Sequence, residues 1–160
     1  TAFKYEYPFA IEDEEEAEAA LVISSTVYDF SVPTTSLRPR ELVVGIGAKR
    51  ETPKETVMKA LENAFKMKKL SILSIVKMVS IDLKKDEVGI IEAAKELGVP
   101  FETYSDKVLN EVEGEFEESE FVKKTTGCGA VSARAAALFG DLILEKYVYN
   151  GVTISIGKVR

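Results

Sequence analysis

The chain has 160 residues, about one domain by length, with 46% hydrophobic residues, 30% charged residues and a net charge of −6, a composition typical of a globular protein rather than a disordered or membrane-spanning one. It contains no histidine and one cysteine, Cys128, which excludes Ser-His-Asp and Cys-His catalysis, imidazole metal sites, internal disulfides and thiolate metal clusters. Any catalytic acid or base must therefore be Asp, Glu, Lys or Tyr.

Residues 1–40 are acidic, with three basic and eight acidic side chains, and we expect them to be the tail of a preceding domain followed by a linker. The pattern predicts a strand over 3–7, a short acidic helix over 12–20, a buried strand over 20–24 and a linker over 29–40 that contains two prolines. No basic and apolar signal-peptide pattern opens the chain, so the expected compartment is the cytoplasm.

From residue 41 onward, predicted strands and helices alternate. Residues 42–47 are apolar on both faces, as is typical of a central parallel strand. Thr52 and Glu55 predict a capping box, with Pro53 in the first turn, for a helix that ends near residue 67. Further elements follow in order: a short helix over 72–76, a strand over 78–82, a helix opened by Asp86 or Glu87 and ended by Gly98, a strand over 101–104, a short helix capped by Ser105, an alanine-rich helix over 130–139, and hairpin strands over 142–149 and 152–159 joined by Asn150-Gly151.

This order predicts an α/β fold for residues 41–160: three layers, α/β/α, around a mostly parallel sheet with a C-terminal antiparallel hairpin. In the helix that ends at Gly98, we expect Val88, Ile91, Ala94 and Leu97 to face the core. Six glutamates and no base between 111 and 120 predict a solvated acidic loop. The remaining body is mildly basic and favours an anionic ligand, whereas nucleic acid is not expected because the basic residues form no stripe or binding motif.

The first candidate site loop spans residues 45–52. It follows a strand and precedes a helix, where open α/β sheets bind ligands and backbone amides favour anions. Lys49 and Arg50 add two cations, and Arg50 can bind a carboxylate in a bidentate way. The loop is neither a dinucleotide fingerprint nor a P-loop, and the alternative is a tight turn with two solvated bases. Its candidate binding residues are Gly45, Gly47, Lys49, Arg50 and Thr52.

Two further loops occupy comparable positions. In 80–87, Asp82 and Glu87 are the candidate catalytic carboxylates, since a carboxylate beside a cation in a cleft can activate water, and Lys84 is a candidate anion ligand; the alternative is capping plus a surface ion pair. In 125–129, Thr126 and Gly127 can turn backbone N–H groups toward an oxyanion, or the loop is a flexible connection. Without histidine, Cys128 is not expected to act as a nucleophile. We expect all three loops to line one cleft.

Together and in this order, the chain segments resemble the C-terminal domain of the cobalamin-biosynthesis protein CbiG. The segments are GIGAKRET (45–52), SIDLKKDE (80–87) and the stretches 94–105, 126–138 and 151–156. The resemblance covers about residues 40–159. That family is the cobalt-precorrin-5A hydrolase of the anaerobic vitamin B12 pathway, and a stand-alone relative, CobE, serves the aerobic pathway.

The resemblance implies hydrolytic opening of the ring A δ-lactone of an anionic cobalt corrinoid, with release of acetaldehyde. The substrate carries its own cobalt, so no cofactor and no protein metal site are expected. Candidate partners are other enzymes of the pathway and a second copy of the chain, not a membrane. The alternative is a non-catalytic corrinoid-binding or carrier module. Three positions differ from residues that the family often has: Ala48 stands for Cys, Glu51 for Gly and Arg134 for Glu.

Overall fold

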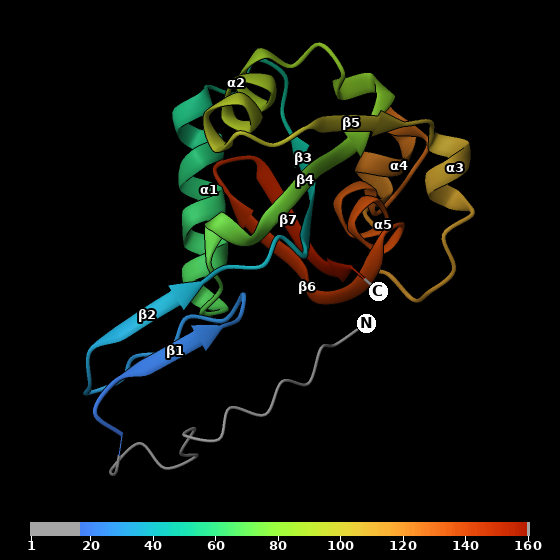
Figure 1. Ribbon diagram of the computed structural model, residues 1–160. Coiled ribbons are helices and arrows are strands. Elements are labelled where there is room, and N and C mark those ends of the chain that lie inside the picture. The colour runs from blue at the N-terminus through green and yellow to red at the C-terminus, as the bar shows by residue number, and fades with distance from the viewer. Residues whose placement is uncertain (1–16, 160) are drawn as a thin grey trace.

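The computed structural model describes residues 17–159, so the strand expected over 3–7 and most of the helix expected over 12–20 lie outside the described residues. The main sheet has five strands in the order β5-β4-β3-β7-β6 (Figure 1). The parallel strands are β3 (Leu42–Ala48), β4 (Ile75–Ile81) and β5 (Phe101–Tyr104). On the other side of β3 lies the antiparallel hairpin of β6 (Gly140–Tyr149) and β7 (Val152–Val159).

Helices cover both faces of this sheet. One face carries α1 (Lys54–Met67) and α2 (Val88–Leu97), and the other carries α3 (Asp106–Asn110), α4 (Glu120–Thr126) and α5 (Val131–Ala137) (Figure 1). Two 3-10 turns, η2 (Ile72–Ser74) and η3 (Asp82–Lys84), flank β4. The predicted α/β class and the mixed sheet with a C-terminal hairpin are confirmed. Across residues 17–159, no helix is both long and apolar enough to cross a membrane.

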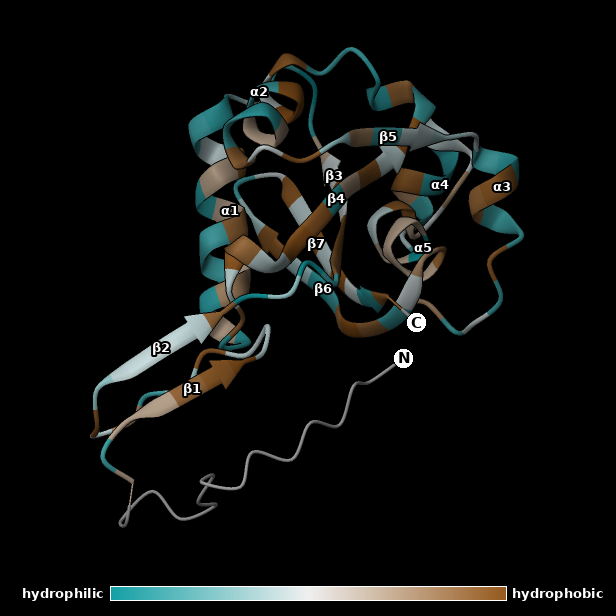
Figure 2. Ribbon diagram, in the orientation of Figure 1, coloured by the Kyte–Doolittle hydropathy of each residue, from teal (hydrophilic) through white to brown (hydrophobic). Residues whose placement is uncertain are grey.

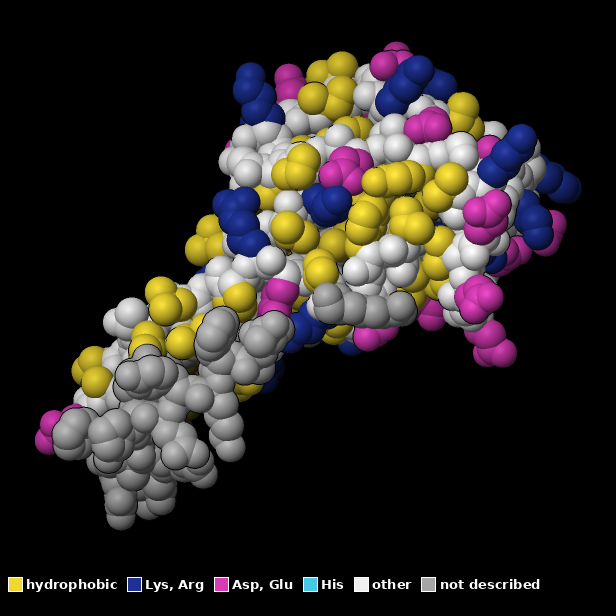
Figure 3. All heavy atoms as spheres, turned by 45° about the vertical axis from the view of Figure 1, so that its right-hand side comes forward, with side chains coloured by type: hydrophobic (Ala, Val, Ile, Leu, Met, Phe, Trp, Pro, Cys, Tyr) yellow, Lys and Arg dark blue, Asp and Glu magenta, His cyan; other side chains and the backbone are white. Residues whose placement is uncertain are grey.

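The two-sided burial of β3 explains why its sequence is apolar at every position. Val44 and Ile46 join a core cluster with α1, whereas Val43 joins a second cluster with Val131 and Ala135 of α5. In Figure 2, β4 is brown along much of its length, while α1 and α2 carry teal segments beside brown ones. Figure 3 shows hydrophobic side chains gathered on the face that the turned view brings forward, with charged side chains around them.

The starts of α1 and α2 differ from expectation. Pro53 is the N-cap of α1 without a side-chain cap, and the Thr52 hydroxyl instead donates to the Lys49 carbonyl at 2.8 Å, so the predicted capping box was wrong. Of the residues expected to face inward in α2, Ala94 is buried and Leu97 packs against the core. Val88 and Ile91 are 64% and 41% exposed, so their predicted inward orientation was wrong. The reason is Gly89, where a Cβ would lie 2.1 Å from the Thr52 carbonyl oxygen; this close approach turns the neighbouring face of α2 inward.

Several boundaries were also shifted. The helix expected over 72–76 is the single turn η2, and β4 already begins at Ile75. The acidic loop ends earlier than expected, because Ser119 accepts a hydrogen bond from the backbone N–H of Val122 and caps α4. The predicted stop at Gly98 is confirmed by its left-handed backbone, with φ of 64°.

The segment before the main sheet forms a two-stranded parallel sheet of β1 (Ala20–Ile23) and β2 (Thr34–Leu37). Only Val22 of β1 is buried, so the buried strand expected here is largely exposed, and β2 lies inside the expected linker. Arg38 Nη1 donates to the carbonyl of Ser24 at 2.9 Å, and Thr26 forms a bridge with Leu70. The Arg38 contact holds the two halves of this segment together, and the Thr26 bridge attaches it to the turn that follows α1.

Candidate functional site

A cavity of about 590 Å³ lies at the carboxyl ends of β3 and β4, beside α5. All three candidate loops border it, through residues 47–50, residues 83–84 and residues 125–126 with Gly129. The strand β3 has β4 on one side and the hairpin on the other, so the cavity lies where the sheet order changes direction, the place at which open α/β sheets bind ligands.

Cationic side chains of the first two loops meet at this cavity. Lys49, Arg50 and Lys84 all line it. The stem of Lys49 lies against Gly151 of the hairpin turn, where a Cβ would be 2.9 Å from Lys49 Cδ, and the φ of 82° at Gly151 favours glycine in any case. The predicted cations therefore surround a single space, which suits an anionic ligand.

The two candidate catalytic carboxylates lie outside this cavity. Glu87 is 8% exposed, accepts a hydrogen bond from the backbone N–H of Glu51 at 3.0 Å and pairs with Lys84 at 3.2 Å. It therefore ties the first loop to the second. Asp82 borders a neighbouring cavity of about 490 Å³, which shares Arg50 and Thr126 with the larger one.

Of the other candidate binding residues, Gly47 and Thr126 line the cavity and three do not. Gly45 is buried under α5, where its Cβ would be 1.8 Å from the Ser132 carbonyl oxygen. Thr52 closes its own turn. Gly127 ends α4 with φ of 81°, and its carbonyl accepts from Asn110 Nδ2 at 2.9 Å. These three residues shape the loops.

One wall of the cavity was not predicted from the sequence. It combines the end of the acidic segment, α4 and the hairpin: Glu117, Ser119, Phe121, Glu145, Lys146 and Thr153. Phe121 is 79% exposed, which is unusual for so large an apolar side chain. A phenylalanine within a charged stretch is the sequence signal that would have pointed to this wall.

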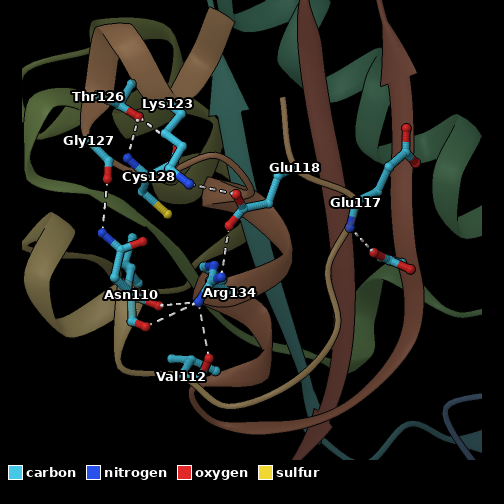
Figure 4. A network of polar contacts seen from close by, with 11 residues as sticks. Asn110, Val112, Glu117, Glu118, Lys123, Thr126, Gly127, Cys128 and Arg134 are labelled. Carbon is cyan, nitrogen blue, oxygen red and sulfur yellow. Dashed lines mark hydrogen bonds and ion pairs between the residues drawn. The ribbon is translucent and has the colours of Figure 1, made fainter. Parts of the chain in front are cut away.

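The acidic segment is held in place by Arg134 of α5 (Figure 4). Its Nη1 donates to the carbonyls of Asn110 at 3.3 Å and Val112 at 3.1 Å, and its Nη2 pairs with Glu118 at 2.9 Å. Lys123 binds the other carboxylate oxygen of Glu118 at 3.0 Å. The glutamates of 111–120 are exposed as expected, but the C-terminal end of the segment is not free, because α5 and α4 supply the cations that fix Glu118.

Cys128 is fully buried, and burial raises the pKa of its thiol. A thiol of that kind is a poor nucleophile. Within residues 17–159, no three His, Cys, Asp or Glu side chains are grouped so that they could hold a metal ion.

Comparisons with known proteins place these features in a family. Residues 42–157 match the family described as Cobalamin synthesis G C-terminus. A cobalt-precorrin-5A hydrolase of Salmonella typhimurium is 37% identical over 146 residues, covering 89% of this chain and 42% of the relative. Protein CobE of Sinorhizobium sp. is 32% identical, covering 72% of this chain and 78% of that protein.

A crystal structure of CobE, described as a protein from the cobalamin (vitamin B12) biosynthetic pathway, superposes with a TM-score of 0.70 at 28% identity, covering 76% of this chain and 92% of that chain. The chain spans less than half the length of the curated hydrolases that it matches. With a family match over 116 of its residues, from 42 to 157, and a fold shared with CobE, this chain belongs to the family of cobalamin synthesis G C-terminal domains.

Proposed function

We propose that this chain takes part in cobalamin biosynthesis as the C-terminal portion of a cobalt-precorrin-5A hydrolase, and that its cavity binds the anionic edge of the cobalt corrinoid. The observation that carries the proposal is the meeting of Lys49, Arg50 and Lys84 around one cavity. Family membership supports the same assignment, because two of the relatives are named cobalt-precorrin-5A hydrolase.

The chemistry of a corrinoid fits the two kinds of wall. Its macrocycle is broad and apolar, and its peripheral acetate and propionate groups are anions. Leu83 and Phe121 present exposed apolar side chains, 49% and 79% exposed, at the cavity, and the ring of Phe121 can stack on a flat conjugated surface. The volume of 590 Å³ lies within the usual range of about 300–1,000 Å³ for small-molecule sites, so we propose that one edge of the macrocycle enters.

Opening a lactone requires water, a base and stabilisation of the oxygen that becomes negative. We assign the base to Asp82, which borders the adjoining cavity and shares Arg50 with the main one. Glu87 is already bound by Lys84 and by the Glu51 amide, so we assign it a positioning role for Lys84 and the first loop. The carbonyl oxygen would be stabilised by Lys49, Arg50 or Lys84.

The test compares binding and turnover. Cobyrinic acid, a cobalt corrin with free peripheral carboxylates, is titrated against the protein and followed by corrin absorbance. Arg50→Ala should weaken binding about tenfold or more, because a charge-assisted pair contributes roughly 1.5–3 kcal/mol, and Arg50→Lys should recover part of the loss. Added salt should weaken binding.

The matched control is Arg40→Ala, since Arg40 donates to the Gly98 carbonyl at 3.3 Å and does not border the cavity. Equal affinity of the Arg50 variants and the parent, or binding that ignores salt, would contradict the proposal. With the lactone corrinoid as substrate, released acetaldehyde reports the hydrolytic step. Binding without acetaldehyde would restrict the function of this chain to a corrinoid-binding module.

A further inference from the structure

A fourth cation, Lys146, lies at the cavity, and an acidic side chain of the same protein already holds it. Lys146 Nζ is 2.8 Å from Glu117 Oε1, and both residues line the cavity. The backbone N–H of Glu117 donates to Glu145 Oε1 at 2.7 Å. The wall formed by the acidic segment and β6 therefore carries two carboxylates, Glu145 and Glu117, and one cation, Lys146.

A β-bulge explains how two adjacent residues of β6 reach the same cavity. Leu144 pairs with Ile156 and Tyr147 pairs with Ile154, so Glu145 and Lys146 together face the single residue Ser155 of β7. In a regular strand, neighbouring side chains point to opposite faces, whereas a bulge redirects a side chain and is common beside active sites. The Ser155 hydroxyl donates to the Glu145 carbonyl and so fixes the bulge.

The two residues that follow Glu117 hold it beside Lys146 through contacts that do not depend on the Glu117–Lys146 ion pair. The adjacent Glu118 is clamped by Arg134 and Lys123 (Figure 4), and the backbone N–H of Ser119 donates to the Gly129 carbonyl at 2.8 Å. The side chain of Glu117 itself is 69% exposed. It can therefore leave Lys146 for solvent while the segment that carries it stays in place.

We infer that Lys146 is a further substrate-binding residue and that Glu117 occupies its anion position until a carboxylate of the ligand displaces it. This rests on the proposed function, since it requires a polyanionic ligand in the cavity. The exchange is isoelectric at Lys146, because one carboxylate replaces another. Breaking the Glu117–Lys146 pair costs little free energy, because an exposed ion pair contributes little to stability. Glu117 thus acts as an internal competitor that favours ligands able to offer a carboxylate at this point.

The test is titration of cobyrinic acid against the parent protein and matched charge variants. Glu117→Gln should bind about two- to fivefold more tightly, the factor expected when a competing exposed ion pair is removed. Glu115→Gln is the control. It removes the same charge at a position two residues from Glu117, and the Glu115 side chain does not line the cavity. It should change affinity by a much smaller factor.

Lys146→Gln should weaken binding of cobyrinic acid. In the double variant, Glu117→Gln should improve affinity less than it does in the parent protein, because Lys146 is no longer present to be released. Near-ultraviolet circular dichroism of each variant checks that the fold is retained. Unchanged or weaker binding of Glu117→Gln, or equal gains from Glu115→Gln, would overturn the inference while leaving the proposed function standing. Absence of corrinoid binding by the parent protein would overturn both.

Discussion

Replacing Gly45 by alanine tests the packing that supports the cavity. A Cβ at this position would lie 1.8 Å from the Ser132 carbonyl oxygen and 2.8 Å from the Ala136 nitrogen, both backbone atoms of α5. Real Cβ contacts under 3.0 Å essentially do not occur, so α5 must retreat from β3 by about 1.2 Å, the difference between 3.0 and 1.8 Å. The first turn of α5 lines the cavity, so its shape changes as well.

The cost follows from that shift. Overpacking a core costs typically 1–3 kcal/mol, and here the obstacle is helix backbone that also packs on β4, β6 and β7, so we expect about 3 kcal/mol at the upper end of that range. The smaller entropy of the unfolded alanine chain offsets about 0.4–1 kcal/mol of this. For a chain of this length the net loss lowers Tm by roughly 4–10 °C.

The assay is urea and thermal unfolding followed by circular dichroism, with Gly47→Ala as the matched control. A Cβ at Gly47 meets only Thr153 Cβ at 3.9 Å, an ordinary contact. Gly47→Ala should therefore change stability by less than about 0.5 kcal/mol. If the two variants unfold within about 0.5 kcal/mol of each other, the account of Gly45 as the position that lets α5 approach β3 is refuted.

Two other features make further predictions. Cys128 is buried and burial raises the pKa of its thiol, so a thiol reagent should label it only at the rate of unfolding, and Cys128→Ala should keep corrinoid binding; rapid labelling of folded protein would count against this. Hydrogen bonds from Lys77, at 2.8 Å, and from Tyr104 hold the pKa of Glu102 below its usual range despite its partial burial. A carboxyl whose pKa is lowered by folding stabilises the fold above its unfolded pKa, and that contribution disappears as the pH falls from the unfolded pKa through the lowered one. Lys77→Met should therefore reduce the acid-induced loss of stability in this window, and identical pH profiles of stability would show that the pair is not responsible.

The sequence predicted the elements whose causes are local. The apolar run of β3, the glycine stop at Gly98, the Ser105 cap and the Asn150-Gly151 turn each depend on neighbours in the chain, and all are present. The meeting of the first two loops was also predictable, because carboxyl ends of parallel strands share one edge of a sheet. The third loop reaches that edge between α4 and α5 and follows no strand. The roles proposed for Asp82, Lys84, Arg50 and the other site residues remain predictions.

Features that depend on tertiary contacts could not be predicted in this way. The orientation of α2 is set by the approach of Gly89 to the Thr52 carbonyl, a contact between residues far apart in the chain. The position of the acidic segment depends on Arg134, which lies on another helix and pairs with Glu118. A run of glutamates looks the same in sequence whether or not such a cation holds it in place.

Because β7 runs antiparallel to β3, the hairpin forms part of the cavity wall. Val152, at the start of β7, pairs with Ala48, at the end of β3, so the hairpin turn lies beside the carboxyl end of the central strand, and the Lys49 backbone N–H donates to the Gly151 carbonyl at 3.1 Å. A parallel strand in this position would have placed its amino end at the opposite edge of the sheet. The turn and the nearby bulge therefore bring Gly151 and Lys146 to the same cavity as Lys49 and Arg50. Loss of β7 would remove both the neighbour of β3 and one wall of the cavity, so the cavity depends on the last strand of the chain as much as on the loops that its sequence first suggested.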